Sequence, residues 1–147
     1  HIIYNETLRD RVCAVSNKTH YNEMNVLSMH ALIGAYQPQG YEWVDELNQV
    51  LAGNIEYFCT YAEKHWKGVA FSRPQGTYMV FLDCTEWCRE HGRDIQWLLD
   101  EGARVGVGYQ DGRPFHGPCH IRVNLALPPS RVREACDRLD RYVFNTR

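Results

Sequence analysis

The chain has 147 residues with 44% hydrophobic and 23% charged residues, the composition of a globular protein rather than a disordered one. Its formal net charge of −2 at pH 7 gives no electrostatic reason to expect a nucleic acid or an anionic membrane as a partner. No apolar run approaches the roughly 20 residues that a membrane-spanning helix needs, and the chain does not open on a signal-peptide pattern.

The first half of the chain predicts helices. Residues 5–17 place apolar side chains at helical spacing after Asn5, a helix-capping residue type. A second helix fits residues 22–36, whose apolar positions form a broad surface. Beyond Pro38, which punctuates the chain, apolar residues keep a period of 3.6 over residues 41–66. A helix of that length indicates an element that links two structural units.

The second half of the chain changes to strand patterns from Gly68 onward. The expected elements are strands over 68–74 and 76–84, a helix over 91–102, strands over 103–112 and 119–128, and a helix from Pro129 onward. Such a unit buries one face of its sheet under the helices. The sequence therefore predicts an α/β (α+β) fold, with a small, mostly antiparallel sheet covered by helices and preceded by a long linker helix.

Cysteine usage favours a reducing compartment. The six cysteines are Cys13, Cys59, Cys84, Cys88, Cys119 and Cys136. They are scattered through a chain that is long enough to bury its own core, so we interpret them as free thiols and expect a cytoplasmic protein. A zinc site is the alternative, because Cys84, Cys88 and His91 lie close together. Their spacing is looser than that of a zinc knuckle and no second tight pair follows, so no metal is predicted.

The most informative segment is the expected strand over residues 120–128. Its aliphatic side chains alternate with polar ones, so Arg122 and Asn124 project from the face opposite the aliphatic residues. The planar guanidinium of an arginine on such a face matches the geometry of a carboxylate. A surface ion pair between Arg122 and an acidic residue of the chain is the alternative.

Several segments together resemble one family of enzymes. The matching segments are GYEWVDELNQVLAGN (40–54), PQGTYMVFLD (74–83) and RVNLALP (122–128), and the matching residues are Trp43, Leu47, Asn54, Gly76, Tyr78, Asp83, Phe115, Gly117, Arg122, Asn124, Ala126 and Pro128. Their order and spacing resemble the class I/II aminotransferase family of fold-type I pyridoxal-phosphate (PLP) enzymes. The cystathionine β-lyase-like carbon–sulfur lyase branch is the most similar, and the resemblance covers nearly the whole chain.

The resemblance implies an organisation for the chain. Residues 1–55 would be the tail of the large PLP domain and the interdomain linker helix, and residues 56–147 the C-terminal small domain of the aminotransferase fold. Members of the family are homodimers, so a homodimer is expected. Helices over 22–36 and 41–60 would lose their usual cover, so we expect them to expose apolar surface and to promote self-association.

The resemblance also implies a function for the polar face of the strand. Arg122 would bind the α-carboxylate of an amino-acid substrate, and Asn124 would shape the pocket. β-Elimination on a cystathionine-like substrate is favoured over transfer of an amino group to a 2-oxo acid. A non-catalytic binding module and a complete small enzyme with a cysteine or zinc site are the alternatives from other classes.

The chain lacks the family's cofactor lysine. It has three lysines, Lys18, Lys64 and Lys67, and the lysine that carries PLP in the family would lie upstream of His1. Lys18 follows a predicted helix rather than a strand, which makes it a poor substitute. No glycine-rich phosphate cradle precedes a helix. We therefore expect no catalytic residue in this chain, PLP in the full-length enzyme, no PLP bound by the fragment, and an inactive fragment.

Overall fold

The structure is a computed structural model that describes residues 2–20 and 24–145. It divides into two compact units, one up to Val44 (the N-terminal unit) and one from Asp45 (the C-terminal unit). This division falls inside a helix, and the domain boundary expected near residue 55 stays a prediction about the family fold. Over the described ranges, no helix combines the length and the apolar character that crossing a bilayer requires.

The N-terminal unit is helical over residues 6–19, 26–35 and 38–44, and none of its described residues is buried. Helix α1 (Glu6–Thr19) and helix α2 (Val26–Ala35) both begin after an asparagine whose side chain accepts a backbone N–H. Asn5 confirms the predicted cap of α1. The predicted start of the second helix at residue 22 was too early, because Asn25 caps it; residues 22 and 23 lie outside the described residues. Neither helix contains a buried residue.

Helix α3 (Pro38–His65) is the long helix that the sequence predicts, and it begins three residues earlier than expected. Proline is compatible with the first turn of a helix because its missing N–H has no partner there anyway. Pro38 therefore starts the helix instead of interrupting the chain. Gly40 has no room for a β-carbon, which would collide with the carbonyl oxygen of Ala35.

The sheet of the C-terminal unit has three antiparallel strands in the described residues: β1 (Met79–Asp83), β2 (Gln110–Asp111) and β3 (His120–Asn124), in the order β1-β3-β2. The strand expected over 68–74 was wrong, apart from one bridge between Ala70 and Asp83. Its apolar residues pack on the core without a ladder of hydrogen bonds, and ion pairs from Arg73 tie this segment to α3.

The strand expected over 103–112 was also largely wrong, since only β2 is extended. Residues 103 and 104 end helix α5 (Ile95–Arg104), and Gly106 follows with a left-handed backbone (φ 76°). Val105 and Val107 pack against the core from this helix end and loop. Their alternation with small residues resembles a strand, although it reflects packing of an irregular segment.

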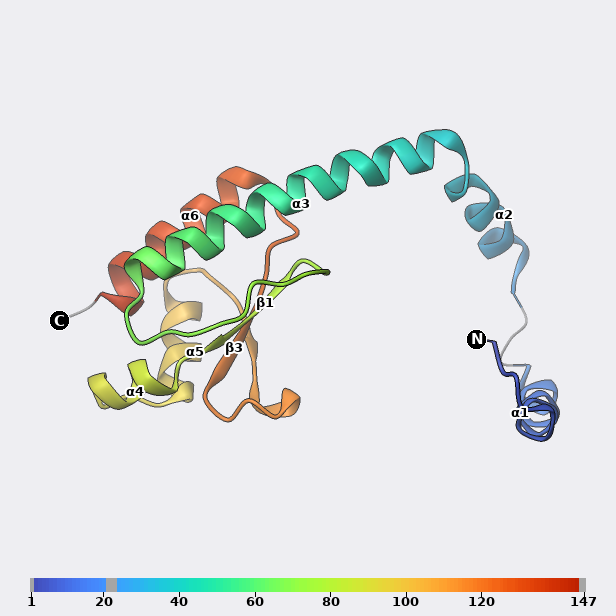
Figure 1. Cartoon of the computed structure of the whole chain (residues 1–147), viewed down its shortest axis with the longest axis horizontal. Coiled ribbons are helices and arrows are strands. Elements are labelled where there is room, and N and C mark those ends of the chain that lie inside the picture. The colour runs from blue at the N-terminus through green and yellow to red at the C-terminus, as the bar shows by residue number, and fades with distance from the viewer. Residues whose placement is uncertain (1, 21–23, 146–147) are drawn as a thin grey trace. The chain divides into compact units, whose positions relative to one another are not determined.

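Helices cover one face of the sheet. Helix α4 (Thr85–His91), which the sequence did not predict, follows β1, and α5 begins at Ile95 behind the Asp94 cap rather than at residue 91. Helix α6 (Pro129–Leu139) continues into a π-helical turn η2 (Asp140–Phe144). Figure 1 shows α6 alongside the C-terminal half of α3. The predicted α+β class, with a small antiparallel sheet covered by helices after a long helix, is confirmed.

The core of the C-terminal unit lies between this sheet and these helices. Its largest fully buried side chains include Phe58, Trp66, Leu82, Trp87, Leu98, Ile121 and Leu139. They come from α3, the segment after it, β1, α4, α5, β3 and α6, so every layer contributes. The aliphatic face of β3 is therefore buried in the core, and the side chains on its opposite face remain at least partly accessible.

Candidate functional site

The open face of the sheet brings together polar and aromatic side chains from all three strands. On β3, Ile121 and Val123 are buried whereas Arg122 between them is half-buried on the other face. Antiparallel pairing places Phe81 of β1 and Gln110 of β2 on either side of Arg122. The alternation predicted from the sequence is thus observed. It makes Arg122 the central charged group of this face.

The guanidinium of Arg122 is held by neutral partners. Its Nε donates a hydrogen bond of 2.7 Å to Oε1 of Gln110, and its central carbon lies 4.0 Å from the centroid of the Phe115 ring. Over residues 2–20 and 24–145, no carboxylate lies within ion-pairing distance of Arg122, and its two Nη groups make no hydrogen bond. The surface ion pair that was the alternative reading is absent from this part of the chain. Arg122 therefore retains its positive charge and its terminal donors for a ligand.

The connection between β2 and β3 supplies the aromatic ring. A 3₁₀ turn, η1 (Arg113–Phe115), folds back over the sheet, and its first residue forms an ion pair of 2.7 Å with Asp111. The backbone of Gly112 donates to the carbonyl of His120 on β3. A β-carbon at Gly117 would collide with the rings of Phe81 and His120. The two ends of the loop are thus packed against the sheet, whereas residues 113–116 between them are exposed and Phe115 contacts Arg122.

Asn124 shapes the backbone after β3. Its side-chain oxygen accepts a hydrogen bond of 2.8 Å from the N–H of Ala126, which turns the chain out of the strand. Asn54, which is only 2% exposed, donates from α3 to the carbonyls of Leu125 and Leu127, at 2.9 and 2.8 Å. This anchor was missed as a structural feature from sequence alone; the signal for it is a lone amide on the apolar stripe of a helix.

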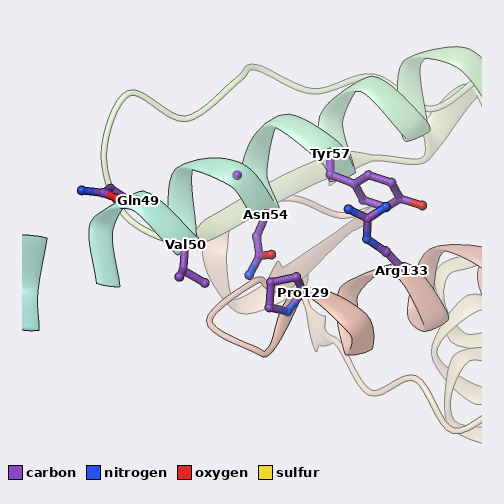
Figure 2. A pocket seen from close by; sticks show the side chains of 7 residues that line it. Gln49, Val50, Asn54, Tyr57, Pro129 and Arg133 are labelled. Carbon is purple, nitrogen blue, oxygen red and sulfur yellow. The ribbon is translucent and has the colours of Figure 1, made fainter. Parts of the chain in front are cut away.

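A separate groove of about 210 Å³ lies between α3 and the start of α6. Figure 2 shows its lining, which consists of Gln49, Val50, Gly53, Asn54, Tyr57, Pro129 and Arg133. The guanidinium of Arg133 lies 4.6 Å from the centroid of the Tyr57 ring. The groove belongs to the helical layer, on the other side of the core from Arg122. It does not contribute to the open face of the sheet.

His120 and Asp83 extend the open face beyond Arg122. The His120 ring lies 4.6 Å from that of Phe81, and its Nδ1 is 3.8 Å from a carboxylate oxygen of Asp83. Partial burial alone would raise the pKa of Asp83. Hydrogen bonds from the hydroxyl and the N–H of Thr85, with the nearby His120, outweigh it, so that the pKa lies below its usual value.

The buried cysteines Cys84, Cys88 and Cys136 are poor nucleophiles. All six are free thiols, and burial raises the pKa of Cys84, of Cys88 to about 12 and of Cys136 to about 12. A thiol with so high a pKa stays protonated at neutral pH, and protonated thiols are weak nucleophiles and weak metal ligands. No group of three or more histidine, cysteine, aspartate or glutamate side chains is arranged to hold a metal ion in the described ranges.

Neither lysine of the C-terminal unit lies on the open face of the sheet. Lys64 lies in the last turn of α3 and Lys67 in the turn that follows, within the layer that covers the aliphatic side of the sheet. Lys18 ends α1 in the other unit. The guanidinium of Arg122 has the geometry to pair with a carboxylate, but the residues described in the C-terminal unit offer no lysine beside it for the attachment of PLP.

Comparisons with known proteins show which sequences and folds the chain is similar to. A "Putative cystathionine beta-lyase" from Mycobacterium leprae is 33% identical over 124 residues, which cover 74% of this chain and 30% of the relative. A PLP-bound C–S lyase from Staphylococcus hominis matches with a TM-score of 0.81 and 25% identity, over 99% of this chain and 37% of its own. The fold of cystalysin from Treponema denticola, whose crystals contain PLP, matches with a TM-score of 0.81 and 23% identity, over 97% of this chain and 36% of its own.

The chain thus spans about a third of the length of the proteins it matches. No protein-family model matches it. The sequence similarity and the structural match nevertheless point to the same group of enzymes, which is also the group that the motifs around Trp43 and Arg122 resemble. The chain belongs to the class I/II aminotransferase family of PLP-dependent enzymes, in its cystathionine β-lyase-like branch.

Proposed function

We propose that this chain is the substrate-carboxylate-binding part of a larger PLP-dependent carbon–sulfur lyase. The observation that carries the proposal is the guanidinium of Arg122, which stands on the open sheet face without an acidic partner in the described residues. A cationic fork on a sheet face that carries no other arginine recruits an anion of matching geometry. The α-carboxylate of an amino acid is such an anion, and cystathionine, which the name of the Mycobacterium leprae relative contains, is an amino acid.

Arg122 would act by binding and orientation. A bidentate contact with the α-carboxylate fixes the direction of the substrate's Cα–H bond and removes rotational freedom before any bond changes. The ring of Phe115 lies against one face of the guanidinium, 4.0 Å from its central carbon, and supports it by a cation–π contact. When bound, PLP supplies an electron sink for the carbanion chemistry of the substrate. Asn124 would contribute by setting the backbone path after β3.

PLP would be attached outside this chain. The described residues of the C-terminal unit include no lysine on the face of Arg122, and the chain spans only about a third of the length of its relatives. We therefore propose that the chain is inactive alone and that the remaining parts of the protein hold the cofactor. Apolar side chains of α2 and the start of α3, such as Leu27 and Trp43, are exposed and would be covered in a homodimer of the complete protein.

The complete protein tests the proposal. We expect it to release a thiol from L-cystathionine in the presence of PLP, and an Arg122→Ala variant to lose about 100-fold in kcat/KM because a charge-assisted bidentate contact is removed. An Arg122→Lys variant should recover only part of this loss, since an ammonium cannot make the planar contact. A full kcat/KM in Arg122→Ala would contradict the role of Arg122.

Transamination is the second candidate, and the same preparation decides it. The fold also matches an aspartate aminotransferase from Thermus thermophilus, with a TM-score of 0.73. Turnover that depends on 2-oxoglutarate and releases no thiol would favour an aminotransferase. A non-catalytic module would show neither reaction. Borohydride reduction of PLP onto Lys18 of the chain alone would disprove the proposal that the cofactor is attached elsewhere.

A further inference from the structure

We propose that Gln110 and Phe115 are positioning residues for Arg122, which present its two Nη groups end-on to the substrate carboxylate. The inference rests on the proposed function, in which Arg122 binds that carboxylate. It goes further in assigning roles to two neighbours and in choosing one of the two edges of the guanidinium. Gln110 acts on the edge of the group and Phe115 on its plane.

Gln110 closes the side-on approach to Arg122. A carboxylate can bind a guanidinium through Nε and one Nη, or end-on through both Nη groups. The Nε–H of Arg122 is already donated to Gln110 Oε1, at 2.7 Å. The pairing of β2 with β3 sets Gln110 directly opposite Arg122, so this hydrogen bond spans neighbouring strands. Only the end-on edge is left with two parallel donors.

The amide of Gln110 suits this role better than a carboxylate would. Its oxygen accepts the Nε–H without neutralising the positive charge of Arg122. A glutamate at the same place would make a salt bridge with Arg122 and would compete with the substrate for the same cation. Because Gln110 is neutral, Arg122 is oriented and still charged, which is the state that an anionic ligand requires.

Phe115 sets the plane of the guanidinium. The distance of 4.0 Å between the central carbon of Arg122 and the ring centroid is well within the range of a cation–π contact. Phe115 is the last residue of η1, and Gly112 and Gly117 on either side of this turn are buried against the sheet. The chain leaves the turn through His116, whose backbone is left-handed (φ 62°). A ring anchored on a tight loop is a more rigid support than a free side chain.

The two contacts together remove the freedom of a long side chain before the substrate arrives. An unsupported arginine loses rotamer entropy when it binds, and this loss subtracts from the affinity. Because Gln110 fixes one edge of the guanidinium and Phe115 one face, Arg122 has little rotamer entropy left to lose on binding. Gln110 and Phe115 should therefore raise the affinity for a carboxylate and affect the rate of the chemical steps less.

Kinetics of the complete, PLP-loaded protein test the inference. We expect Gln110→Met and Phe115→Leu each to raise the KM for L-cystathionine about 10-fold while kcat changes less than about 2-fold. Phe115→Tyr keeps the ring face and should restore the KM. Gln110→Glu should raise the KM more than Gln110→Met does, because it pairs with Arg122. The dissociation constant of propionate, measured by NMR titration without turnover, should rise in parallel, whereas binding of neutral propionamide should not change.

Two matched controls remove the same kinds of contact elsewhere. Thr60 accepts a hydrogen bond from Arg73 at 3.2 Å, and the ring of Tyr57 lies under Arg133. Thr60→Val and Tyr57→Leu should leave the KM and the affinity for propionate unchanged. Thermal unfolding of each variant identifies any loss of structure. If Gln110→Met or Phe115→Leu unfolds the protein, the near-isosteric variants Gln110→Glu and Phe115→Tyr still test the inference.

The outcomes separate this inference from the proposed function. Unchanged KM and propionate affinity in both Gln110→Met and Phe115→Leu, with Arg122→Ala still impaired, would overturn the positioning roles and leave the carboxylate site intact. A KM that is insensitive to Arg122→Ala would overturn both. A fall in kcat with an unchanged KM in Gln110→Met or Phe115→Leu would also contradict the inference, because it would indicate an effect on chemistry rather than on binding.

Discussion

The two units of the chain use similar local signals and reach opposite results. In the N-terminal unit, α1 and α2 have good asparagine caps, but neither buries a single residue, and Leu27 is 82% exposed. In the C-terminal unit, α5 has an equivalent aspartate cap, and its Leu98 is fully buried. Caps and helical periodicity therefore decide where a helix forms, and the presence of a partner surface decides what it stabilises.

The largest expected contrast between the units is a pair of leucine truncations. Leu98→Ala should lower the free energy of unfolding of the C-terminal unit by about 3 kcal/mol, because it removes fully buried methyl groups and leaves a cavity. Leu27→Ala, on the exposed surface of α2, should change it by less than about 0.5 kcal/mol. Urea unfolding followed by tryptophan fluorescence measures both. Equal losses of unfolding free energy in the two variants would contradict the contrast between a unit with a buried core and a unit without buried residues.

The next largest effect is expected at Asn54, the buried side chain on α3 that binds the backbone after β3. Asn54→Leu should lower the free energy of unfolding by about 2 kcal/mol, because the carbonyls of Leu125 and Leu127 lose their donor in a water-poor environment. Asn25→Ala removes the cap of α2 and should reduce helix content without shifting the main unfolding transition. Circular dichroism distinguishes the two. A shift of the main transition in Asn25→Ala would show that α2 is coupled to the core.

A smaller effect is expected on self-association, which the exposed apolar surface of the helices should cause. Exposed apolar residues were predicted on the helices over 22–36 and 41–60, and the structure confirms them at Leu27, Ile33, Trp43 and Val50. The double change Leu27→Glu and Ile33→Glu should raise the dissociation constant of self-association about 10-fold, because buried apolar area is lost from the contact. Sedimentation at several concentrations measures it. A wild-type chain that is strictly monomeric would contradict the expectation.

The smallest expected effect is a dependence of stability on acid pH. The pKa of Asp83 is lower in the folded chain than its usual value, so its contribution is present above about pH 4 and is lost as pH falls through the folded pKa. Thermal unfolding between pH 5 and 3, in unbuffered salt of constant ionic strength, should show a smaller decline in Asp83→Asn than in the wild type. Parallel declines would remove Asp83 as a cause.

Sequence reasoning placed Arg122 on the face of β3 opposite the buried aliphatic residues, which the structure confirms. The alternation around Arg122 is a local property, because a strand with a period of two has one aliphatic face whatever it packs against. The same holds for the long helix and for the Asn5 cap, which depend on neighbours along the chain. The failures lie where local patterns are ambiguous: Val105 and Val107 alternate as in a strand although they lie beyond the end of a helix.

The chain's own sequence thus determined the α+β class, the family and the polar face that carries Arg122, whereas the attachment of the cofactor outside this chain stays a prediction. Only the tertiary structure decided that Gln110 and Phe115, 12 and 7 positions away along the chain, support the guanidinium. The physical reason is that strand pairing and loop packing join residues whose separation in sequence says nothing about their distance in space. The charge of Arg122 is a property of its residue type, whereas its orientation is a property of the fold.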